Sequence, residues 1–473
     1  MFLRLTALGL HGPTDAFNRR VMEQSLRSTL RDWESIGDLQ YVDRPVDPRY
    51  ELGAVLSLRK DGPAQFFRQV QGYDMPVVAN VLNTRERLAR GLGLERSELQ
   101  GACIAALDHG IEPTVVAEGP AQEVVHQGQP DIPALLPVPT WFERERGPYV
   151  TAGVIVAKDP ETGQRNVSIA RLRVEGGDRL LAGIAPSHHL SKLLRRAQAR
   201  GHHLEIAVAI GNHPAVLIAS QMYVELGHDE YHVAGALLAE PLRLVRCRTV
   251  DLEVPAEAEI VLEGTLHPNE TLEEGPVSEF PGFYVNYGPG YMGQVSAITH
   301  RQDAVFQAIL PGYAPEHCLL GGVAIGATTC RALRRVMPNV GRVLITNGGM
   351  GRLHAIITLH NPQAGQGSQA ITLAMAQVNL LKLVIVVDDD IDPEDWTQVE
   401  LALATRMRSE RDIMIIPGAS AERCEPLEEN RTVTKVGIVA TTRPGEAEPG
   451  GRSELARAPH DVLERVRREL DTY

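Results

Sequence analysis

Ionisable and polar side chains gather in three short segments of this sequence. Their amide, imidazole, guanidinium and carboxylate groups can hold metal ions, bind anions or move protons. The residues of each segment could also have a purely structural role. The helices and strands around each segment are therefore needed to tell a functional site from a structural one. The segments are RNVSIARLR with Asn166, Ser168 and Arg171, APSHHLSKLL with His188 and His189, and LEEGPVSEFPGFY with Glu274 and Glu279.

The first segment has the pattern of a β-strand, because β-branched and apolar residues alternate with polar ones. Strand alternation places Asn166 and Ser168 on one face. Arg171 is then expected on the other face, unless a β-bulge turns it. For this segment alone, an edge strand with solvated polar side chains is an equally good explanation.

The second segment predicts the start of a helix, with Ser187 as N-cap and His188 and His189 in the first turn. The free backbone N–H groups and the helix dipole at such a position favour an anion, for example a phosphate. For an isolated histidine pair, exposed or structural residues are the more common explanation.

The third segment places carboxylates around a turn at Gly275 and Pro276, which could bring Glu274 and Glu279 to one cavity. Close carboxylates repel each other, so one can stay protonated and act as an acid. This is favoured where an arginine holds the other carboxylate ionised. The alternative is a solvated acidic loop.

The composition is typical of a folded, water-soluble globular chain. The 473 residues include 60 acidic and 47 basic ones, a net charge of −13, which repels nucleic acids and anionic membranes. Five cysteines without C-x-x-C spacing favour neither a disulfide framework nor a zinc site. No signal peptide or membrane-spanning stretch is recognised, so we expect a cytoplasmic protein without a nucleic-acid partner.

Hydrophobic periodicity predicts an α/β (α+β) fold with three domains and a terminal helix. A proline-studded stretch at 120–139 marks the first boundary. The six strand-like runs that follow indicate a barrel or a thick antiparallel sheet. The predicted units are an N-terminal α/β domain at 1–120 that starts with a helix over 15–33, a strand-rich domain at 121–320, a C-terminal α/β domain at 321–450, and a charged helix within 451–473 whose apolar stripe could contact another subunit.

Taken together, these residues occur in an order that resembles the UbiD-type decarboxylase family, which uses prenylated FMN. The resemblance includes Asn166 with Arg171, then His189, Glu230 and the Glu274-Gly-Pro-x-x-Glu279 segment. It extends to VLIASQMYV, EYHVAGALLAEPLRLVRC, ITHRQDAVFQAIL and LVIVVDDDIDPEDW, and so covers the length of the chain. It implies that the 121–320 domain is a split β-barrel of the flavin-reductase type that binds the cofactor.

The resemblance also implies two cation sites beside the flavin phosphate. Asn166, His189 and Glu230 would hold Mn²⁺ or Mg²⁺, for which oxygen ligands with one imidazole are well suited. A K⁺ site would use mainly main-chain oxygens around Ala219, Ser220 and Met222, with Glu230 bordering both ions. The other residues expected at the cofactor are Ser168, Ile169, Ala170, Arg171 and His188.

The resemblance assigns catalysis to Arg171, Glu274 and Glu279. Arg171 would bind and orient the substrate carboxylate through its fork of N–H donors. Glu274 would fix the direction of the guanidinium, and Glu279 would donate the proton that replaces CO₂.

Three positions depart from the family pattern, one of them Val167 where some members have a bulky aromatic residue, and two more could shape the substrate pocket. His360, in ITLHNPQAGQG, stands where the family usually has a lysine on the flavin phosphate, and a neutral imidazole offers less charge there. Ser278 replaces a more frequent glycine in the acidic motif. Phe280 and His317 are candidate pocket residues, although a structural role for His317 is at least as good an explanation.

The implied function is reversible, non-oxidative decarboxylation of an aromatic or heteroaromatic acid, or of an α,β-unsaturated one. The partners would be the small carboxylic acid, CO₂ and a flavin prenyltransferase that supplies the cofactor. The terminal helix predicts a homodimer or a higher homo-oligomer. The alternative is a non-catalytic or partner-dependent subunit that binds flavin or metal within a larger carboxylase assembly.

Overall fold

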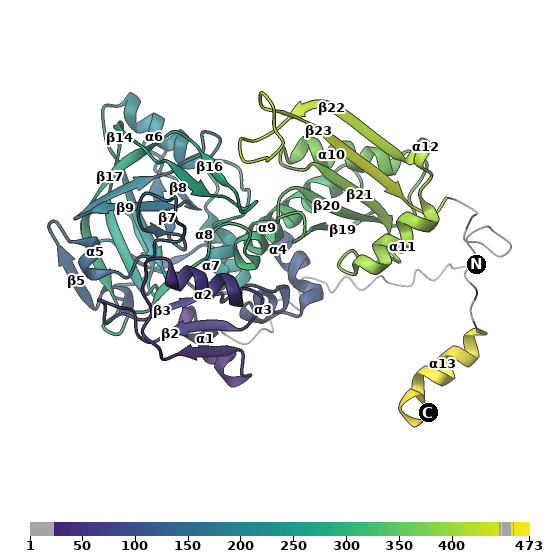
Figure 1. Ribbon diagram of the computed structural model, residues 1–473, viewed down its shortest axis with the longest axis horizontal. Coiled ribbons are helices and arrows are strands. Elements are labelled where there is room, and N and C mark those ends of the chain that lie inside the picture. The colour runs from purple at the N-terminus through teal and green to yellow at the C-terminus, as the bar shows by residue number, and fades with distance from the viewer. Residues whose placement is uncertain (1–22, 444–445, 447–455, 457) are drawn as a thin grey trace.

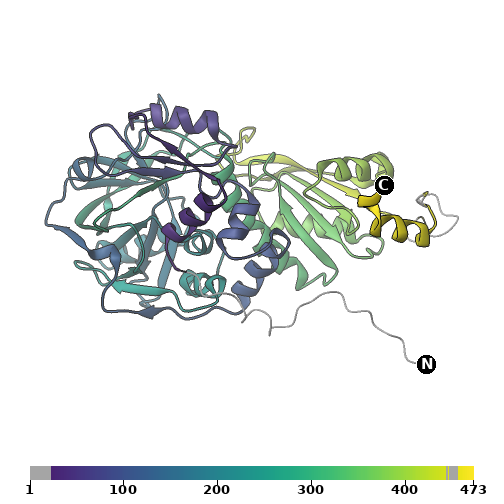
Figure 2. The ribbon, with the colours of Figure 1, turned by 90° about the horizontal axis from the view of Figure 1, so that it is seen from below.

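The computed structural model describes residues 23–443, 446, 456 and 458–473. The first part of the predicted helix at 15–33 therefore lies outside the described residues. The N-terminal and central parts form one large lobe, and the C-terminal part forms a second lobe beside it (Figure 1, Figure 2). Within the described ranges, no helix is both long and apolar enough to cross a membrane.

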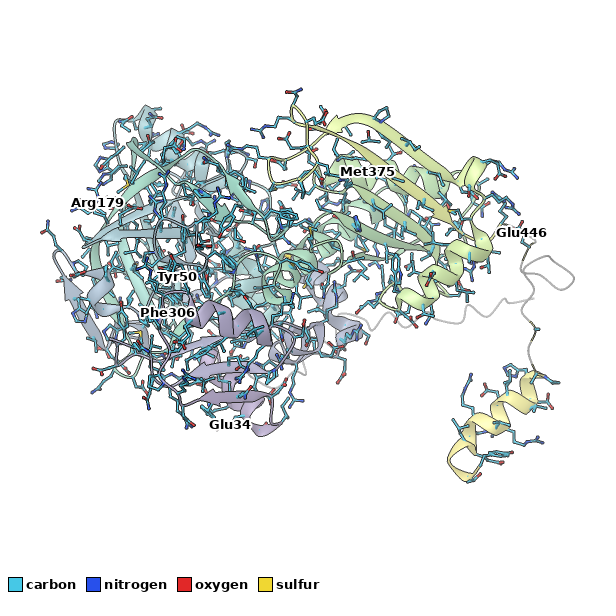
Figure 3. All side chains as sticks on the ribbon, viewed as in Figure 1. Glu34, Tyr50, Arg179, Phe306, Met375 and Glu446 are labelled. Atoms are coloured by element: carbon cyan, nitrogen blue, oxygen red, sulfur yellow. The ribbon has the colours of Figure 1, made fainter. Side chains whose placement is uncertain are left out.

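The N-terminal part is a mixed four-stranded sheet with helices packed against it. Its strand order is β1-β2-β3-β18, so a strand from far along the chain completes the sheet. Phe306 of β18 is fully buried inside the large lobe (Figure 3). The elements are α1 (Leu26–Ser35), β1 (Leu39–Val42), α2 (Glu51–Arg59), β2 (Ala64–Phe67), β3 (Val77–Ala79), α3 (Arg85–Gly91), α4 (Leu99–Asp108) and β18 (Phe306–Ala308).

The central part is built on an antiparallel sheet of nine strands, as the strand-rich pattern predicts. The order is β6-β9-β10-β17-β14-β11-β7-β8, with β5 also paired to β17. Within the described residues, no strand pairing closes this sheet into a barrel. The strands are β5 (Val124–Gln127), β6 (Tyr149–Val150), β7 (Val154–Lys158), β8 (Arg165–Ile169), β9 (Leu172–Gly176), β10 (Arg179–Ala182), β11 (Leu204–Ile210), β14 (Ile260–Glu273) and β17 (Pro289–His300).

Helices and two small sheets complete the central part. A three-stranded sheet has the order β13-β12-β4, and β15 pairs with β16. These elements are β4 (Thr114–Val115), α5 (Ile132–Leu135), α6 (His189–Ala199), α7 (Pro214–Ala219), α8 (Glu230–Leu238), β12 (Arg243–Arg246), β13 (Glu253–Pro255), β15 (Pro276–Ser278) and β16 (Tyr284–Asn286).

The C-terminal part is a mixed sheet in the order β19-β20-β21-β23-β22, with an apolar core on each face. Met375 lies in one of these cores (Figure 3). The boundary predicted at residue 320 falls inside α9, which packs between the two lobes (Figure 1). The elements are α9 (Pro315–Arg334), β19 (Val340–Ile345), β20 (His354–Leu359), α10 (Gln366–Gln377), β21 (Leu383–Asp388), α11 (Trp396–Arg406), α12 (Ser409–Asp412), β22 (Ile413–Ser420) and β23 (Thr432–Ala440).

The predicted terminal helix is present as α13 (His460–Arg468). None of its residues is buried, although Val462, Leu463 and Val466 form an apolar stripe. The stripe is therefore available to a partner surface, as the sequence predicts.

Candidate active site

Arg171, Glu274 and Glu279 form one ion-pair network. Nε and Nη2 of Arg171 donate hydrogen bonds to Oε1 and Oε2 of Glu274 at 2.7 and 2.8 Å. Nη1 donates to Oε1 of Glu279 at 2.9 Å. Burial alone would lower the pKa of Arg171, but the hydrogen bonds to Glu274 and the charges of both carboxylates raise it. The guanidinium therefore stays charged and holds both carboxylates.

All three residues lie just beyond the ends of strands. Because β8 ends at Ile169 and β9 begins at Leu172, Arg171 lies in the link between them, where strand alternation does not apply. The strand alternation used to predict the direction of Arg171 therefore does not extend to this residue. Glu274 directly follows β14, and Gly275, with a φ of +82°, turns the chain into β15.

Gly183, which the sequence analysis missed, leaves room for the ion pair. A Cβ atom at this position would lie 2.6 Å from Oε1 of Glu274 and 3.0 Å from Nη2 of Arg171. Both contacts are too short, so a side chain here would push the two groups apart. Close approach of the backbone to a functional group is a known reason for a glycine.

An aromatic ring joins this network to the C-terminal lobe. The guanidinium of Arg171 lies 4.7 Å from the centroid of the Tyr287 ring, and that of Arg423 lies 5.1 Å from it. Arg423 belongs to the loop between β22 and β23. Tyr287 thus lies between Arg171 and an arginine of the C-terminal lobe.

Asn166 and Glu230 face each other in the interior and could share a metal ion. Nδ2 of Asn166 donates to Oε1 of Glu230 at 2.9 Å, and the main-chain N–H of Val167 donates to Oε2 at 2.6 Å. Burial raises the pKa of Glu230 to about 8. Oδ1 of Asn166 is buried and has no hydrogen-bond partner among the described residues, which is uncommon for an amide oxygen. A cation would satisfy this oxygen and stabilise the buried carboxylate, so the residues fit the implied metal.

His189 and His188 begin α6 as the last parts of the implied cofactor site. The helix starts one residue later than predicted, with His188 and not Ser187 as N-cap. Burial and the Lys192 charge lower the pKa of His189, which favours the neutral ring that binds metals. Within the described residues, no hydrogen bond links His189 to the Asn166 and Glu230 pair, and no three His, Cys, Asp or Glu side chains are grouped so that they could hold a metal ion by themselves.

The residues predicted for K⁺ lie in one buried turn that ends α7. Ala219, Ser220 and Met222 are all buried. The main-chain oxygens of Ala219 and Met222 already accept hydrogen bonds from Met222 and Val224 at 3.0 and 3.1 Å. Ser168 and Ile169 lie at the end of β8, and Ala170 lies with Arg171 in the link to β9.

His360 lies at the wrong edge of the C-terminal sheet to join this group. It follows the end of β20 and forms an ion pair with Asp389, which follows the parallel strand β21. Arg352 and Arg423 lie at the opposite edge, where β20 and β23 begin. A six-residue strand, about 20 Å long, therefore separates His360 from the edge that faces the catalytic network.

Phe280 directly follows Glu279 in the chain, and His317 lies in the first turn of α9. Phe280 is buried, and its N–H donates to Oε2 of Glu279 at 3.3 Å. Nδ1 of His317 donates to the main-chain oxygen of Gly312 at 3.1 Å. Burial and the nearby Arg352 charge lower the pKa of His317, while Glu279 opposes this. These effects together favour the neutral ring of His317.

A cavity of about 270 Å³ lies beside the loop that carries Glu279. Lys60, Ser278 and Gly282 are among its lining residues, and none of the three predicted catalytic side chains lines it. The cavity therefore borders the loop that carries Glu279, and the side chains of Arg171, Glu274 and Glu279 lie outside its lining.

Family models match most of the chain in three consecutive stretches. They describe the N-terminal domain of 3-octaprenyl-4-hydroxybenzoate carboxy-lyase over residues 30–106, its Rift-related domain over 114–314 and its C-terminal domain over 318–440. A curated relative, the anhydromevalonate phosphate decarboxylase of Methanothermobacter thermautotrophicus, is 36% identical over 411 residues, which cover 86% of this chain and 95% of the relative.

Solved structures agree with these matches. The UbiD-class enzyme HmfF from Pelotomaculum thermopropionicum in complex with FMN is 38% identical, with a TM-score of 0.88, 95% of this chain covered and 100% of that one. An evolved dimeric form of the same enzyme in complex with prFMN is 37% identical, with a TM-score of 0.84, 94% of this chain covered and 98% of that one. The chain belongs to the UbiD family of decarboxylases, which are carboxy-lyases.

Proposed function

We propose that the chain is a prenylated-FMN-dependent decarboxylase that acts reversibly on an aromatic, heteroaromatic or α,β-unsaturated carboxylic acid. The observation that carries the proposal is the Arg171 guanidinium held between Glu274 and Glu279. A fixed guanidinium matches a substrate carboxylate, and a carboxyl group beside it can exchange protons.

The flavin is supported by relatives whose structures contain FMN or prFMN. Asn166, His189 and Glu230 would hold Mn²⁺ or Mg²⁺ at the flavin phosphate, and the unpartnered oxygen of Asn166 supports this. Glu230 would also border K⁺ at Ala219, Ser220 and Met222. Ser168, Ile169, Ala170, Arg171 and His188 would contact the cofactor. His360 has no place in this proposal, because it lies at the far edge of the C-terminal sheet.

The residues of the chain would divide the reaction between them. Arg171 binds and orients the substrate carboxylate, while the two hydrogen bonds to Glu274 keep the guanidinium from rotating. When bound, prenylated FMN would supply an acceptor for the electron pair that stays on the substrate after CO₂ leaves. The incoming carboxylate competes with Glu279 for Nη1 of Arg171 and so frees Glu279 to carry a proton. Glu279 then delivers that proton to the vacated carbon.

The proposal is tested by CO₂ release from a panel of aromatic, heteroaromatic and unsaturated acids. The protein is co-produced with a flavin prenyltransferase, which we propose as its cofactor supplier. Release of CO₂ from at least one acid is expected, and protein without the prenylated cofactor should release none. No release by protein that carries the modified flavin would contradict the proposal and favour a partner-dependent subunit.

Two further features belong to the same proposal. We expect the nine-stranded sheet to act as a split barrel that holds the flavin. We also expect a homodimer or higher homo-oligomer that uses α13, whose apolar stripe is not buried. Truncation after residue 457 should therefore lower the mass measured by light scattering, and an unchanged mass would contradict a role for α13.

A further inference from the structure

A second arginine of the central sheet, Arg173, holds the main chain of Glu274. Arg173 lies on β9, two residues after Arg171. Its Nη1 donates a hydrogen bond to the main-chain oxygen of Glu274, and its Nη2 donates to that of Glu273 at 3.4 Å. Arg171 holds the carboxylate of the same Glu274. Two arginines from one short stretch of chain therefore fix both the side chain and the main chain of Glu274.

The oxygens that Arg173 holds lie where the pairing of β14 with β17 ends. Glu273 is the last residue of β14, and its partner in the ladder is Pro289. Proline has no N–H group, so it donates no ladder hydrogen bond. Glu274 is buried, and a buried carbonyl group needs a donor. The Arg173 guanidinium supplies a donor at the point where the sheet stops supplying one.

The guanidinium of Arg173 stays charged although it is buried. Only 4% of its side chain is exposed, and its Nε donates to Oε1 of Glu175 on the same strand. Burial alone would lower the pKa of Arg173, but the hydrogen bond to Glu175 and the charge of that carboxylate raise it. A hydrogen bond from a charged donor is about twice as strong as one from a neutral donor. Arg173 therefore holds the main chain of Glu274 more firmly than a neutral side chain could.

We propose that Arg173 is a positioning residue, which fixes Glu274 and through it the direction of the Arg171 guanidinium. The inference rests on the proposed function, in which Arg171 binds the carboxylate that is lost. Two hydrogen bonds tie the Arg171 guanidinium to the Glu274 carboxylate, so a shift of that carboxylate redirects the guanidinium. Gly275 follows at a φ of +82°, and a glycine loses much conformational freedom in such a turn. The hydrogen bond from Arg173 offsets part of this cost and keeps Glu274 in place.

The test compares R173M and R173K with the native protein in two measurements. Hydrogen–deuterium exchange of FMN-loaded protein, read by mass spectrometry, follows the main-chain amides of residues 273–278. We expect these amides to exchange at least about tenfold faster in R173M, because their turn has lost a charged donor. Steady-state kinetics of the protein with prenylated FMN uses the acid that releases CO₂ fastest. We expect R173M to raise KM about 10- to 100-fold and to lower kcat less, because Arg171 binds the carboxylate while Glu279 carries the proton. R173K keeps one charged donor and should lie between R173M and the native protein in both measurements.

R179M is the matched control, because Arg179 lies on the neighbouring strand β10 and pairs with the carboxylate of Glu270 at the surface. It should keep the native exchange at 273–278 and the native KM. Unchanged exchange in folded R173M would overturn the inference. Faster exchange with a native KM would also overturn it, because Arg173 would then have a structural role alone. If R173M does not fold, R173K decides by the same two measurements.

Failure of the proposed function would give a different result. A native protein that carries prenylated FMN and releases no CO₂ from any acid would contradict the proposed function and, with it, the role of Arg173 in catalysis. The exchange measurement needs no turnover, so it would still show whether Arg173 holds Glu274. Turnover by the native protein with native exchange and KM in R173M would contradict the inference and leave the proposed function standing.

Discussion

Arg423 donates a hydrogen bond from Nη1 to the main-chain oxygen of Tyr287 at 2.7 Å. The same arginine lies over the Tyr287 ring, which also contacts the guanidinium of Arg171. The C-terminal lobe thus holds both the backbone and the ring of the residue that packs on Arg171. We infer that Tyr287 is a positioning residue for the substrate carboxylate.

Replacing Tyr287 with Leu removes the ring between the two guanidinium groups. A cation–π contact is worth about 0.5–2 kcal/mol, so we expect kcat/KM to fall about 3- to 30-fold, with a higher KM because Arg171 is less well oriented. Tyr287→Phe keeps the ring and should keep most of the activity. Steady-state kinetics on both variants checks this, and equal losses in the two would assign the effect to the hydroxyl.

Replacing Gly183 with Ala should disrupt the Arg171 and Glu274 pair. The added Cβ lies too close to both groups, and a displacement of about 1 Å can cost about 100-fold in rate. We expect kcat/KM to fall by about that factor while thermal unfolding shows a folded protein. Gly101→Ala is the control, because a Cβ there meets open space in α4. Comparable activity in the two variants would refute the close-approach explanation.

Replacing Asn166 with Leu removes the unpartnered buried oxygen beside Glu230. If that oxygen binds a metal, Mn²⁺ affinity should fall about 10- to 100-fold, as the metal content after dialysis would show. Asn212→Leu removes another buried unpartnered amide oxygen at a different place and should keep the metal. Unchanged Mn²⁺ content in the Asn166 variant would contradict the assigned site.

Glu145 should make stability depend on pH. Burial raises its pKa from 4.5 to about 7. The folded chain therefore keeps a proton that the unfolded chain releases, so stability is lost as pH rises from about 4.5 to 7 and is level above. Glu145→Gln should abolish this loss and gain on the order of 3 kcal/mol relative to the native chain between pH 4 and 8. Denaturant unfolding at several pH values measures the difference.

The exposed Glu143 supplies the control for that experiment. Glu143→Gln should leave the pH dependence of stability as in the native chain. A Glu145→Gln variant with a native pH profile would show that the carboxyl is not protonated in the folded state.

Local patterns predict much of the fold. Apolar, β-branched runs predict strands such as β11 and β21, and the apolar stripe after Pro459 predicts α13. The completion of the N-terminal sheet by β18 could not be predicted, because pairing between distant segments leaves no local periodicity. The split barrel was expected from the resemblance, while the strand pairings show an open antiparallel sheet.

The candidate site, like the fold, could be predicted from the sequence only in part. Arg171, Glu274 and Glu279 could be named because short motifs carry them, but the direction of Arg171 could not, since it depends on where β8 ends. The contact of Arg423 with Tyr287 spans 136 residues and has no motif. His360 was expected at the cofactor because its segment matches the family. Such a match does not reveal at which edge of the sheet the residue lies.

The role of Glu279 as proton donor is tested most directly by comparing native protein with Glu279→Gln in D₂O, both loaded with prenylated FMN. Glu273→Gln, at an exposed neighbour, is the control. We expect the native protein and the control to release CO₂ and form product with one deuterium at the vacated carbon. Glu279→Gln should keep its flavin and release CO₂ at least about 100-fold more slowly. Turnover of Glu279→Gln at the native rate would contradict the mechanism.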